Sequence, residues 1–300
     1  MSQHFARTGP MPLVSPTGHT PPIQFIGLEC SLTAGLHRLD DHGGFDGALL
    51  SVHLTNVQAT EFVGSACMVA PGVAITAGHV VTHVDQGRER DSSLYPEAVG
   101  LHADGTLSAW LVRRTYVIPG TDAGILTLEP RTDVYSKDHI SIFLMDVGLP
   151  MVGDQVVAVG LRGEDSYQHK DDGSVCVFAD LYFSVGEVSR IYADGRDRVM
   201  MPGPCIEVVF DTLSGMSGGP VFNSDGHLIG INSTSMDGIS WPSLLAPAIG
   251  QRICGTWPPH VWTSSSMSLA ELSKEANIAH KDRVRFRMTP DGVKTIWNDG

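Results

Sequence analysis

Short apolar runs separated by polar turns dominate the chain between Ala48 and about Ile253, and long amphipathic helical patterns are scarce. Short runs of apolar and β-branched residues bounded by turn residues are typical of β-strands. One set of strands is predicted at residues 48–54, 64–69, 73–76, 107–113 and 123–128. A second set is predicted at residues 155–160, 181–191, 205–210, 220–222 and 227–232. The pattern therefore predicts an all-β body made of two groups of short strands.

The dipeptide Asp-Gly occurs eight times, beginning at residues 46, 104, 172, 194, 225, 237, 291 and 299. Both residues tolerate the left-handed backbone conformation that tight hairpin turns need, and several copies separate predicted strands. Consecutive strands joined in this way pair antiparallel. We therefore predict two antiparallel six-stranded Greek-key β-barrels, followed by a short C-terminal helix and a hairpin.

The predicted barrels divide the chain into four parts. Residues 1–45 form an N-terminal extension, rich in Pro, Gly, Ser and Thr, which we expect to be mostly irregular apart from an apolar piece at residues 23–26. Residues 46–130 form the first barrel, and residues 131–253 form a linker and the second barrel. Residues 254–300 form a tail, in which Ser268 begins a short helical pattern and residues 284–297 resemble a hairpin. We favour packing of this tail on a barrel over binding of a partner.

Composition and charge limit the classes of function. The 300 residues are 42% hydrophobic, and no run reaches the roughly eighteen apolar residues that a membrane span needs. The net charge of -13 argues against a nucleic-acid partner and favours cationic peptides. The first residues lack the apolar core of a secretion signal. Five cysteines without C-x-x-C spacing predict free thiols in a cytoplasmic protein and no zinc site. They are Cys30, Cys67, Cys176, Cys205 and Cys254.

The first candidate for chemistry is the stretch Ser-Gly-Met-Ser-Gly-Gly-Pro-Val-Phe at residues 214–222. Glycines on both sides of Ser217 allow a tight loop that presents its hydroxyl and lets a substrate backbone come close. The same loop turns the backbone N–H groups of Gly215 and Ser217 toward one point, where they can hold an oxyanion. The alternative interpretation is a glycine-rich hairpin turn without chemistry.

A second motif, Ile-Thr-Ala-Gly-His-Val-Val, lies upstream at residues 75–81. With this pair of motifs the chain resembles the trypsin-like serine peptidases of the chymotrypsin fold, and within them the HtrA (Deg) type. In that family T-A-x-H carries the general base and G-x-S-G-G-P the nucleophile. The resemblance covers about residues 48–253. It implies a chymotrypsin-like fold in which His79 is the base, Ser217 is the nucleophile, and Gly215 and Ser217 supply the oxyanion hole.

The third member of such a triad is a carboxylate that orients the imidazole. Asp122 stands just before the apolar strand at residues 123–128, which resembles the D-I-A-L-L-x-L segment of the family. Asp104 lies in an Asp-Gly turn, and Asp133 and Asp138 lie in a polar linker, so we select Asp122.

A zinc site at His79 and His83 is the rival interpretation of the histidines, because residues four apart share a helix face. Zinc peptidases of the H-E-x-x-H type place glutamate after the first histidine, and here that residue is Val80. We therefore expect no metal and no cofactor.

Substrate specificity is left open between two alternatives. Asp211 lies six residues before Ser217, where trypsin-like enzymes place the acid that selects Lys or Arg at P1. The segment Gly-Ile-Asn-Ser-Thr-Ser at residues 230–235 resembles instead the HtrA type, whose members often favour small aliphatic P1 residues. The resemblance implies substrate contacts from one group of residues, partly through an added strand. They are Asp211, Ser214, Asn232, Ser233, Thr234 and Ser235.

Activation must differ from that of trypsin-like zymogens. Those carry aspartate before the serine, which pairs with a newly cleaved N-terminus, whereas Met216 cannot form this ion pair. The tail after residue 253 is also too short for the PDZ domain that usually follows an HtrA peptidase domain. We therefore expect regulation by loop ordering or by an activating protein partner.

The sequence thus predicts a serine endopeptidase that hydrolyses peptide bonds through a Ser-His-Asp triad and an acyl-enzyme intermediate. The competing class is a catalytically silent module that binds extended peptides on the same fold. A third alternative is an enzyme that stays latent until a partner orders its loops. No triad residue is missing, which favours the enzyme.

Overall fold

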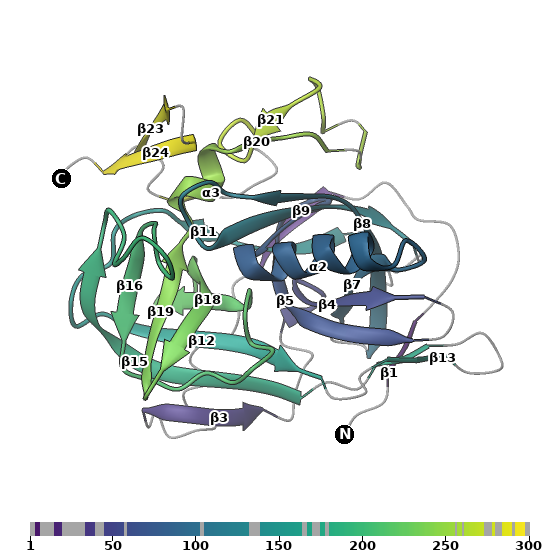
Figure 1. Cartoon of the computed structure of the whole chain (residues 1–300), viewed down its shortest axis with the longest axis horizontal. Helices are drawn as coiled ribbons and strands as arrows, with labels where there is room; N and C mark the ends of the chain where they lie inside the picture. The colour runs from purple at the N-terminus through teal and green to yellow at the C-terminus, as the bar shows by residue number, and fades with distance from the viewer. Residues whose placement is uncertain are drawn as a thin grey trace.

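Strands make up most of the part of this protein that the structure describes (Figure 1). The computed structural model describes residues 4–6, 15–19, 34–39, 45–56, 59–102, 105–131, 139–163, 167–169, 175–177, 180–255, 257–259, 261–272, 278–279, 284–289 and 292–297. Two helices occur among these residues, α2 (Gly78–Arg90) and α3 (Ala246–Gly250). Neither helix of the described part has the length and apolar character that crossing a bilayer requires.

Six antiparallel strands form the first barrel. They are β4 (Leu49–Thr55), β5 (Thr60–Ala70), β6 (Val73–Ala77), β7 (Tyr95–Leu101), β8 (Thr106–Val117) and β9 (Ala123–Pro130). The order β8-β7-β4-β5-β6-β9 closes on itself because β8 also pairs with β9. Five of these strands were predicted, whereas β7 and α2 were not.

Six more antiparallel strands form the second barrel. They are β12 (Gln155–Arg162), β15 (Asp180–Tyr192), β16 (Cys205–Val208), β17 (Pro220–Asn223), β18 (Leu228–Met236) and β19 (Ile239–Leu244). The order β17-β12-β15-β16-β19-β18 closes through the pair β17–β18. Asp237 and Gly238 join β18 to β19 with φ of 53° and 78°, the left-handed conformation expected of Asp-Gly. The predicted chymotrypsin-like pair of six-stranded barrels is confirmed.

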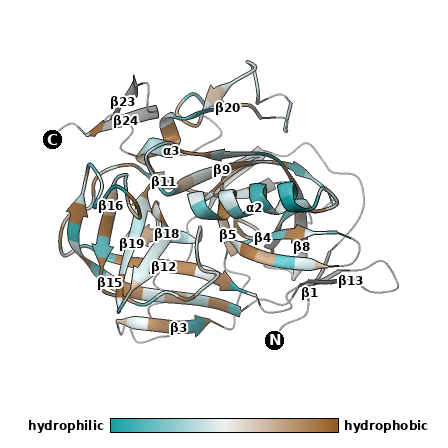
Figure 2. Ribbon diagram, viewed as in Figure 1, coloured by the Kyte–Doolittle hydropathy of each residue, from teal (hydrophilic) through white to brown (hydrophobic). Residues whose placement is uncertain are grey.

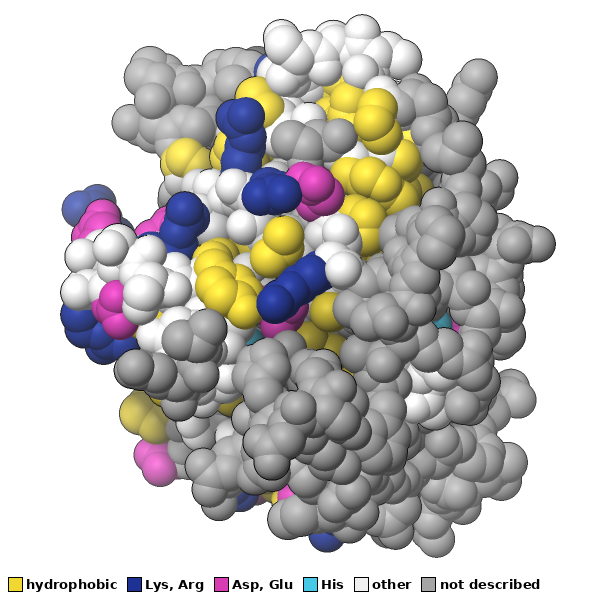
Figure 3. Space-filling model, turned by 90° about the vertical axis from the view of Figure 1, so that its right-hand side faces the viewer, with side chains coloured by type: hydrophobic (Ala, Val, Ile, Leu, Met, Phe, Trp, Pro, Cys, Tyr) yellow, Lys and Arg dark blue, Asp and Glu magenta, His cyan; other side chains and the backbone are white. Residues whose placement is uncertain are grey.

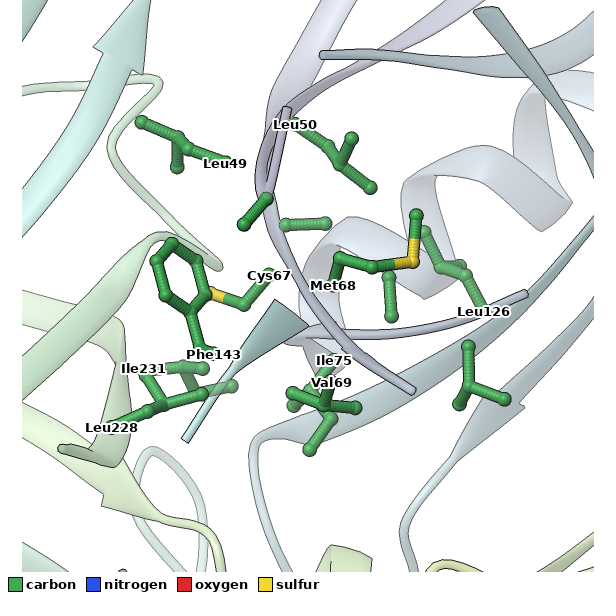
Figure 4. Close-up of a cluster of buried hydrophobic side chains, with 14 of the residues drawn as sticks. Leu49, Leu50, Cys67, Met68, Val69, Ile75, Leu126, Phe143, Leu228 and Ile231 are labelled. Carbon is green, nitrogen blue, oxygen red and sulfur yellow. The ribbon is translucent and has the colours of Figure 1, made fainter. Parts of the chain in front are cut away.

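One hydrophobic cluster connects the two barrels. Figure 4 shows Met68 and Leu126 of the first barrel on one side and Leu228 and Ile231 of β18 on the other. The same cluster includes Phe143, at the end of β10 (His139–Phe143), whose ring is 5.1 Å from that of Phe222 in β17. Figure 2 shows the hydrophobic strand positions and the hydrophilic face of α2. Because buried side chains from both barrels interdigitate, the barrels are held in a fixed relation.

The N-terminal extension contains three short strands among its described residues. These are β1 (His4–Ala6), β2 (Ser15–His19) and β3 (Gly35–Leu39), which pair with β8, β10 and β15. The extension is therefore more regular than expected, because sheet edges of the body offer it backbone partners. The apolar piece at residues 23–26 lies outside the described residues.

The C-terminal tail packs on the body, as we favoured. The ring of Trp257 lies 5.5 Å from that of Trp110, and the Cys254 N–H donates to the Tyr116 hydroxyl at 2.9 Å. The predicted hairpin is confirmed as β23 (Val284–Thr289) and β24 (Gly292–Trp297). Ser268 begins a turn in which its N–H donates to Glu271 at 2.7 Å, and residues 273–277 lie outside the described part.

The remaining strands are short. They are β11 (Met145–Asp146), β13 (Tyr167–His169), β14 (Val175–Val177), β20 (Arg252–Ile253), β21 (Met267–Ser268) and β22 (Ile278–Ala279). Cys67, Cys205 and Cys254 are free thiols. Asp104, Asp133 and Asp138, which were not selected for the triad, lie outside the described residues, as do Asp172, Asp291 and Asp299.

Candidate active site

His79 stands in the first turn of α2, directly after the buried strand β6. Its side chain is 50% exposed, at the start of a helix whose buried face consists of Val80, Val81 and Val84 with two glycines. The His79 N–H donates to Asp122 Oδ1 at 2.9 Å, which satisfies one of the free N–H groups of the helix start. A β-carbon on Gly78 would lie 3.0 Å from the same oxygen, so glycine allows this close approach.

Asp122 also binds the imidazole of His79. Its Oδ2 lies 2.9 Å from His79 Nδ1 and accepts a further hydrogen bond from the Ser233 hydroxyl. Only 17% of the carboxylate side chain is exposed. With its proton on Nδ1, the imidazole donates to Asp122, and Nε2 is then the acceptor. The structure therefore brings the predicted base and the predicted orienting carboxylate into contact.

The loop of Ser217 lies between the barrels. The Ser217 carbonyl accepts a hydrogen bond from the Ser65 N–H at 2.8 Å, and the Gly218 N–H donates to the Asn232 carbonyl at 2.8 Å. The next residue, Gly218, packs directly on Ser65 and on Thr76, which stands near the end of β6. The half-buried Ser217 is thus held beside the strand end from which His79 emerges.

The backbone amides of this loop are divided into two groups. The N–H groups of Met216, Gly218 and Gly219 donate to backbone carbonyls of Leu213, Asn232 and Met216. Within the described part of the chain, the N–H groups of Gly215 and Ser217 have no such partner. These two amides are the ones predicted for the oxyanion hole, and they remain available to a ligand.

Met216 shows how the loop keeps its shape without an ion pair. It is fully buried, its sulfur accepts the Leu213 N–H at 3.2 Å, and a β-carbon on Gly160 would lie 2.6 Å from its Cα. Apolar packing against β12 therefore takes the place that an aspartate ion pair would fill.

Ser65 was not identified from the sequence, yet it connects three segments of the site. Its N–H binds Ser217, its hydroxyl donates to the Gly215 carbonyl at 3.1 Å, and the same oxygen accepts the Leu161 N–H at 2.9 Å. It stands in a predicted strand, but only the fold shows that it faces the other barrel.

Two residues expected to bind substrate have other contacts. The buried Asn232 amide donates to the Val159 carbonyl at 2.7 Å, and its backbone pairs with Gly218 and Gly219. Asn232 therefore supports the nucleophile loop through its side chain. The Ser233 hydroxyl binds Asp122, so it supports the carboxylate.

The other predicted substrate contacts are accessible. Thr234 is half-buried, and Ser235 and Ser214 are exposed. β17 pairs with β18 only as far as Ile231, and no described strand covers the same edge at residues 233–235. That edge can accept an extended peptide as an added strand.

Asp211 does not form the buried acid that a basic P1 preference requires. The residue is exposed, and its carbonyl accepts a hydrogen bond from the Ser184 hydroxyl. Its Oδ1 is 3.9 Å from the position of a β-carbon on Gly238, at the turn after β18.

The histidines of the rival zinc site point to different carboxylates. His79 Nδ1 binds Asp122, whereas His83 Nε2 lies 2.7 Å from Glu61 Oε1. No group of three metal-binding side chains was found in the described part of the chain.

A groove of about 680 Å³ lies apart from these residues, on the first barrel. It is lined by parts of α2, β7 and β8, among them Arg88, Tyr95 and Leu111. Figure 3 shows the molecule from the side of the first barrel, where hydrophobic side chains gather between Lys or Arg side chains. None of the predicted site residues lines this groove.

Comparison with known proteins supports the assignment of a family. A family model described as the trypsin-like peptidase domain matches residues 64–231. No curated protein matches the chain. Among solved structures, Deg5 matches with a TM-score of 0.47 and 19% identity, covering 66% of this chain and 84% of that chain. The protease domain of MamO from Magnetospirillum magneticum, in its apo form, matches with a TM-score of 0.45 and 17% identity, covering 67% of this chain and 93% of that chain. The family match spans more than half of the protein and includes His79, Asp122 and Ser217, and the chain belongs to the trypsin-like peptidase domain family.

Proposed function

We propose that this protein is a serine endopeptidase in which Ser217 is the nucleophile, His79 the general base and Asp122 the orienting carboxylate. The observation that supports this most strongly is the double contact of Asp122 with the backbone N–H and Nδ1 of His79. The Ser65–Ser217 backbone bond holds the serine loop next to the same strand end.

In the proposed reaction these residues act in turn. His79 Nε2 accepts the proton of the Ser217 hydroxyl while Oγ attacks the carbonyl carbon of the scissile bond. The N–H groups of Gly215 and Ser217 donate to the resulting oxyanion. The imidazolium, stabilised by Asp122, returns its proton to the leaving amine, and the acyl-enzyme forms. Water then attacks the acyl-enzyme with His79 again as base, which releases the new carboxyl terminus and restores Ser217.

Substrates are expected to bind in an extended conformation along residues 233–235. The open edge of β18 supplies backbone donors and acceptors, which suits peptides of varied sequence. The net charge of -13 favours cationic segments at longer range.

A fluorophosphonate probe tests this function. It reacts only with an activated serine, so we expect the intact protein to be labelled and the Ser217→Ala variant not to be. Ser224→Ala is the matched control, because Ser224 is an exposed serine in the turn between β17 and β18. Unlabelled intact protein that still binds an extended peptide would favour the silent binding module. Labelling that appears only with an added partner protein would favour latency.

A further inference from the structure

The loop between β15 and β16, residues 193–204, reaches from the second barrel to the surroundings of Asp122. The sulfur of Met201 is 3.4 Å from the Ser233 hydroxyl, which donates to Asp122. A β-carbon on Gly203 would lie 2.6 Å from the Gly120 carbonyl and from Thr121 Cγ2. The loop therefore contacts both the hydrogen-bond donor to the carboxylate and the segment that precedes it.

A compact turn fixes Met201 within this loop. Asp197 Oδ1 accepts hydrogen bonds from the N–H groups of Val199 at 2.8 Å and Met200 at 2.6 Å. Its Oδ2 accepts a hydrogen bond from Arg196 Nε at 2.8 Å. The pKa of Asp197 lies well below its usual range. The main cause is the hydrogen bond from the Val199 N–H, and those from the Met200 N–H and the Arg196 side chain add to it. The N–H of Arg196 also donates to the Met201 carbonyl at 2.9 Å.

The base of the turn rests on the wall of the second barrel. The Arg196 guanidinium lies 4.0 Å from the centre of the Trp241 ring. Trp241 Nε1 donates to Glu207 Oε2 at 3.2 Å, and the Tyr192 hydroxyl donates to the same oxygen at 2.9 Å. Met201, Cys205 and Trp241 share one small buried cluster. Val199 and Met200 at the tip are exposed, whereas Met201 is only 1% exposed, so the loop presents this one methionine to the site.

We infer that Met201 is a positioning residue for the catalytic carboxylate: it keeps water away from the Ser233–Asp122 hydrogen bond, and the Asp197 turn keeps it there. This inference rests on the proposed function. The Ser233 hydroxyl has one proton, and a thioether is too weak an acceptor to draw it from a carboxylate. Water in the same place would donate to Asp122 and accept from Ser233, and it would loosen the bond to His79 Nδ1.

Two substitutions separate exclusion of water by the side chain from a specific contact made by its sulfur. Met201→Ala opens room for water, whereas Met201→Leu keeps the apolar volume and removes the sulfur. Met200→Ala is the matched control, because Met200 is an exposed methionine of the same turn. None of the three substitutions changes a charge, so the charges of Arg196, Asp197 and Glu207 around this loop stay the same.

The direct readout is the proton resonance of His79 Nδ1–H in the folded, full-length protein, assigned with His79→Gln. We expect a sharp downfield signal in the wild type, Met201→Leu and Met200→Ala, and a broadened or lost signal in Met201→Ala, because water then exchanges this proton. Fluorophosphonate labelling of Ser217 should slow about five- to tenfold in Met201→Ala and stay within about twofold in the other two variants. Circular dichroism and thermal melting show whether each variant is folded.

The outcomes distinguish the inference from the proposed function. The inference is overturned if folded Met201→Ala keeps the sharp Nδ1–H signal, or if Met201→Leu loses it equally. An unlabelled wild type with the expected pattern of Nδ1–H signals would reject the peptidase activity and leave the role of Met201 supported.

Discussion

Gly218 and Thr76 lie so close together that a β-carbon on Gly218 would overlap the Thr76 hydroxyl and the Ser65 carbonyl. Gly218 belongs to the loop of the predicted nucleophile, and Thr76 belongs to the strand that leads to the predicted base. The contact therefore joins the two motifs that stand far apart in the sequence. Since Gly218 has φ of 80°, the position excludes other residues by backbone conformation as well as by space.

We predict that Gly218→Ala destabilises the protein by at least about 2 kcal/mol, because backbone atoms cannot move aside cheaply. Urea unfolding measures this loss, and probe labelling of Ser217 should fall with it. Gly153→Ala is the control, since Gly153 has φ of 93° and nothing within 4 Å of a β-carbon. Backbone strain alone should lower the stability of that variant by about 1 kcal/mol, and its labelling rate should stay the same. Equal effects in the two variants would show that the contact with Thr76 is unimportant.

Ser65→Ala should lower both stability and reactivity. It removes the hydroxyl that binds the Gly215 carbonyl and the Leu161 N–H, and a buried polar group left unsatisfied costs about 1–3 kcal/mol. Because Gly215 carries a predicted oxyanion donor, we expect labelling to slow by roughly tenfold. Ser108→Ala is the matched control, because Ser108 is a buried serine of β8 whose hydroxyl donates to the Gly100 carbonyl of β7 at 3.4 Å. It should lose stability without losing reactivity; a similar slowing in Ser108→Ala would argue against a specific role for Ser65.

The buried side chain of His53 should make the stability of the protein depend on pH. Complete burial in the first barrel lowers its pKa from 6.5 to about 3. The unfolded chain therefore binds a proton near pH 6.5 that the folded protein accepts only near pH 3. Stability is fully present above pH 6.5 and falls by up to about 1.4 kcal/mol per pH unit below it, until the folded pKa is reached.

Urea unfolding between pH 7 and pH 4 measures this slope. We expect it to be shallower in His53→Gln, relative to that variant's own stability at pH 7, and unchanged in His83→Gln, whose side chain is half-exposed. The same slope in His53→Gln and the wild type would assign the pH dependence to other groups.

Asp211→Ser should leave the cleavage profile on a peptide library unchanged. The carboxylate is exposed, so it lacks the desolvated setting in which an acid selects a basic P1 residue. We therefore expect P1 residues to be small and apolar in both proteins. Cleavage after Lys or Arg that disappears in Asp211→Ser would show that substrate binding buries this carboxylate.

Most of the fold was predicted from local sequence patterns, and the two elements that were not predicted, β7 and α2, have physical reasons for it. The strand β7, Tyr-Pro-Glu-Ala-Val-Gly-Leu, contains a proline and a glutamate that argue against a buried strand. Glu97 is nevertheless fully buried, because Arg131 Nη1 lies 2.7 Å from its carboxylate. That partner is distant in the sequence, so no local pattern could reveal it. The buried face of α2 is also short, with Val80, Val84 and Gly87 at helical spacing among polar neighbours.

The candidate active site was also predicted only in part. His79 was selected because its motif follows an apolar strand, Asp122 because it stands just before one, and Ser217 because glycines surround it in a distinctive motif. The supporting contacts of Ser65, Asn232, Ser233 and Met201 were missed or given another role. Their hydrogen bonds cross between strands or barrels, and such pairings exist only once the barrels close.

The central claim is that His79 and Asp122 act as one unit on Ser217. The most direct test is the rate constant of fluorophosphonate labelling in His79→Ala, in Asp122→Asn and in the double variant. We expect a loss of about a thousandfold or more for each single change, and a double variant within about twofold of His79→Ala, because residues that act together lose their effect together. Losses that multiply in the double variant, or wild-type labelling in Asp122→Asn, would contradict it.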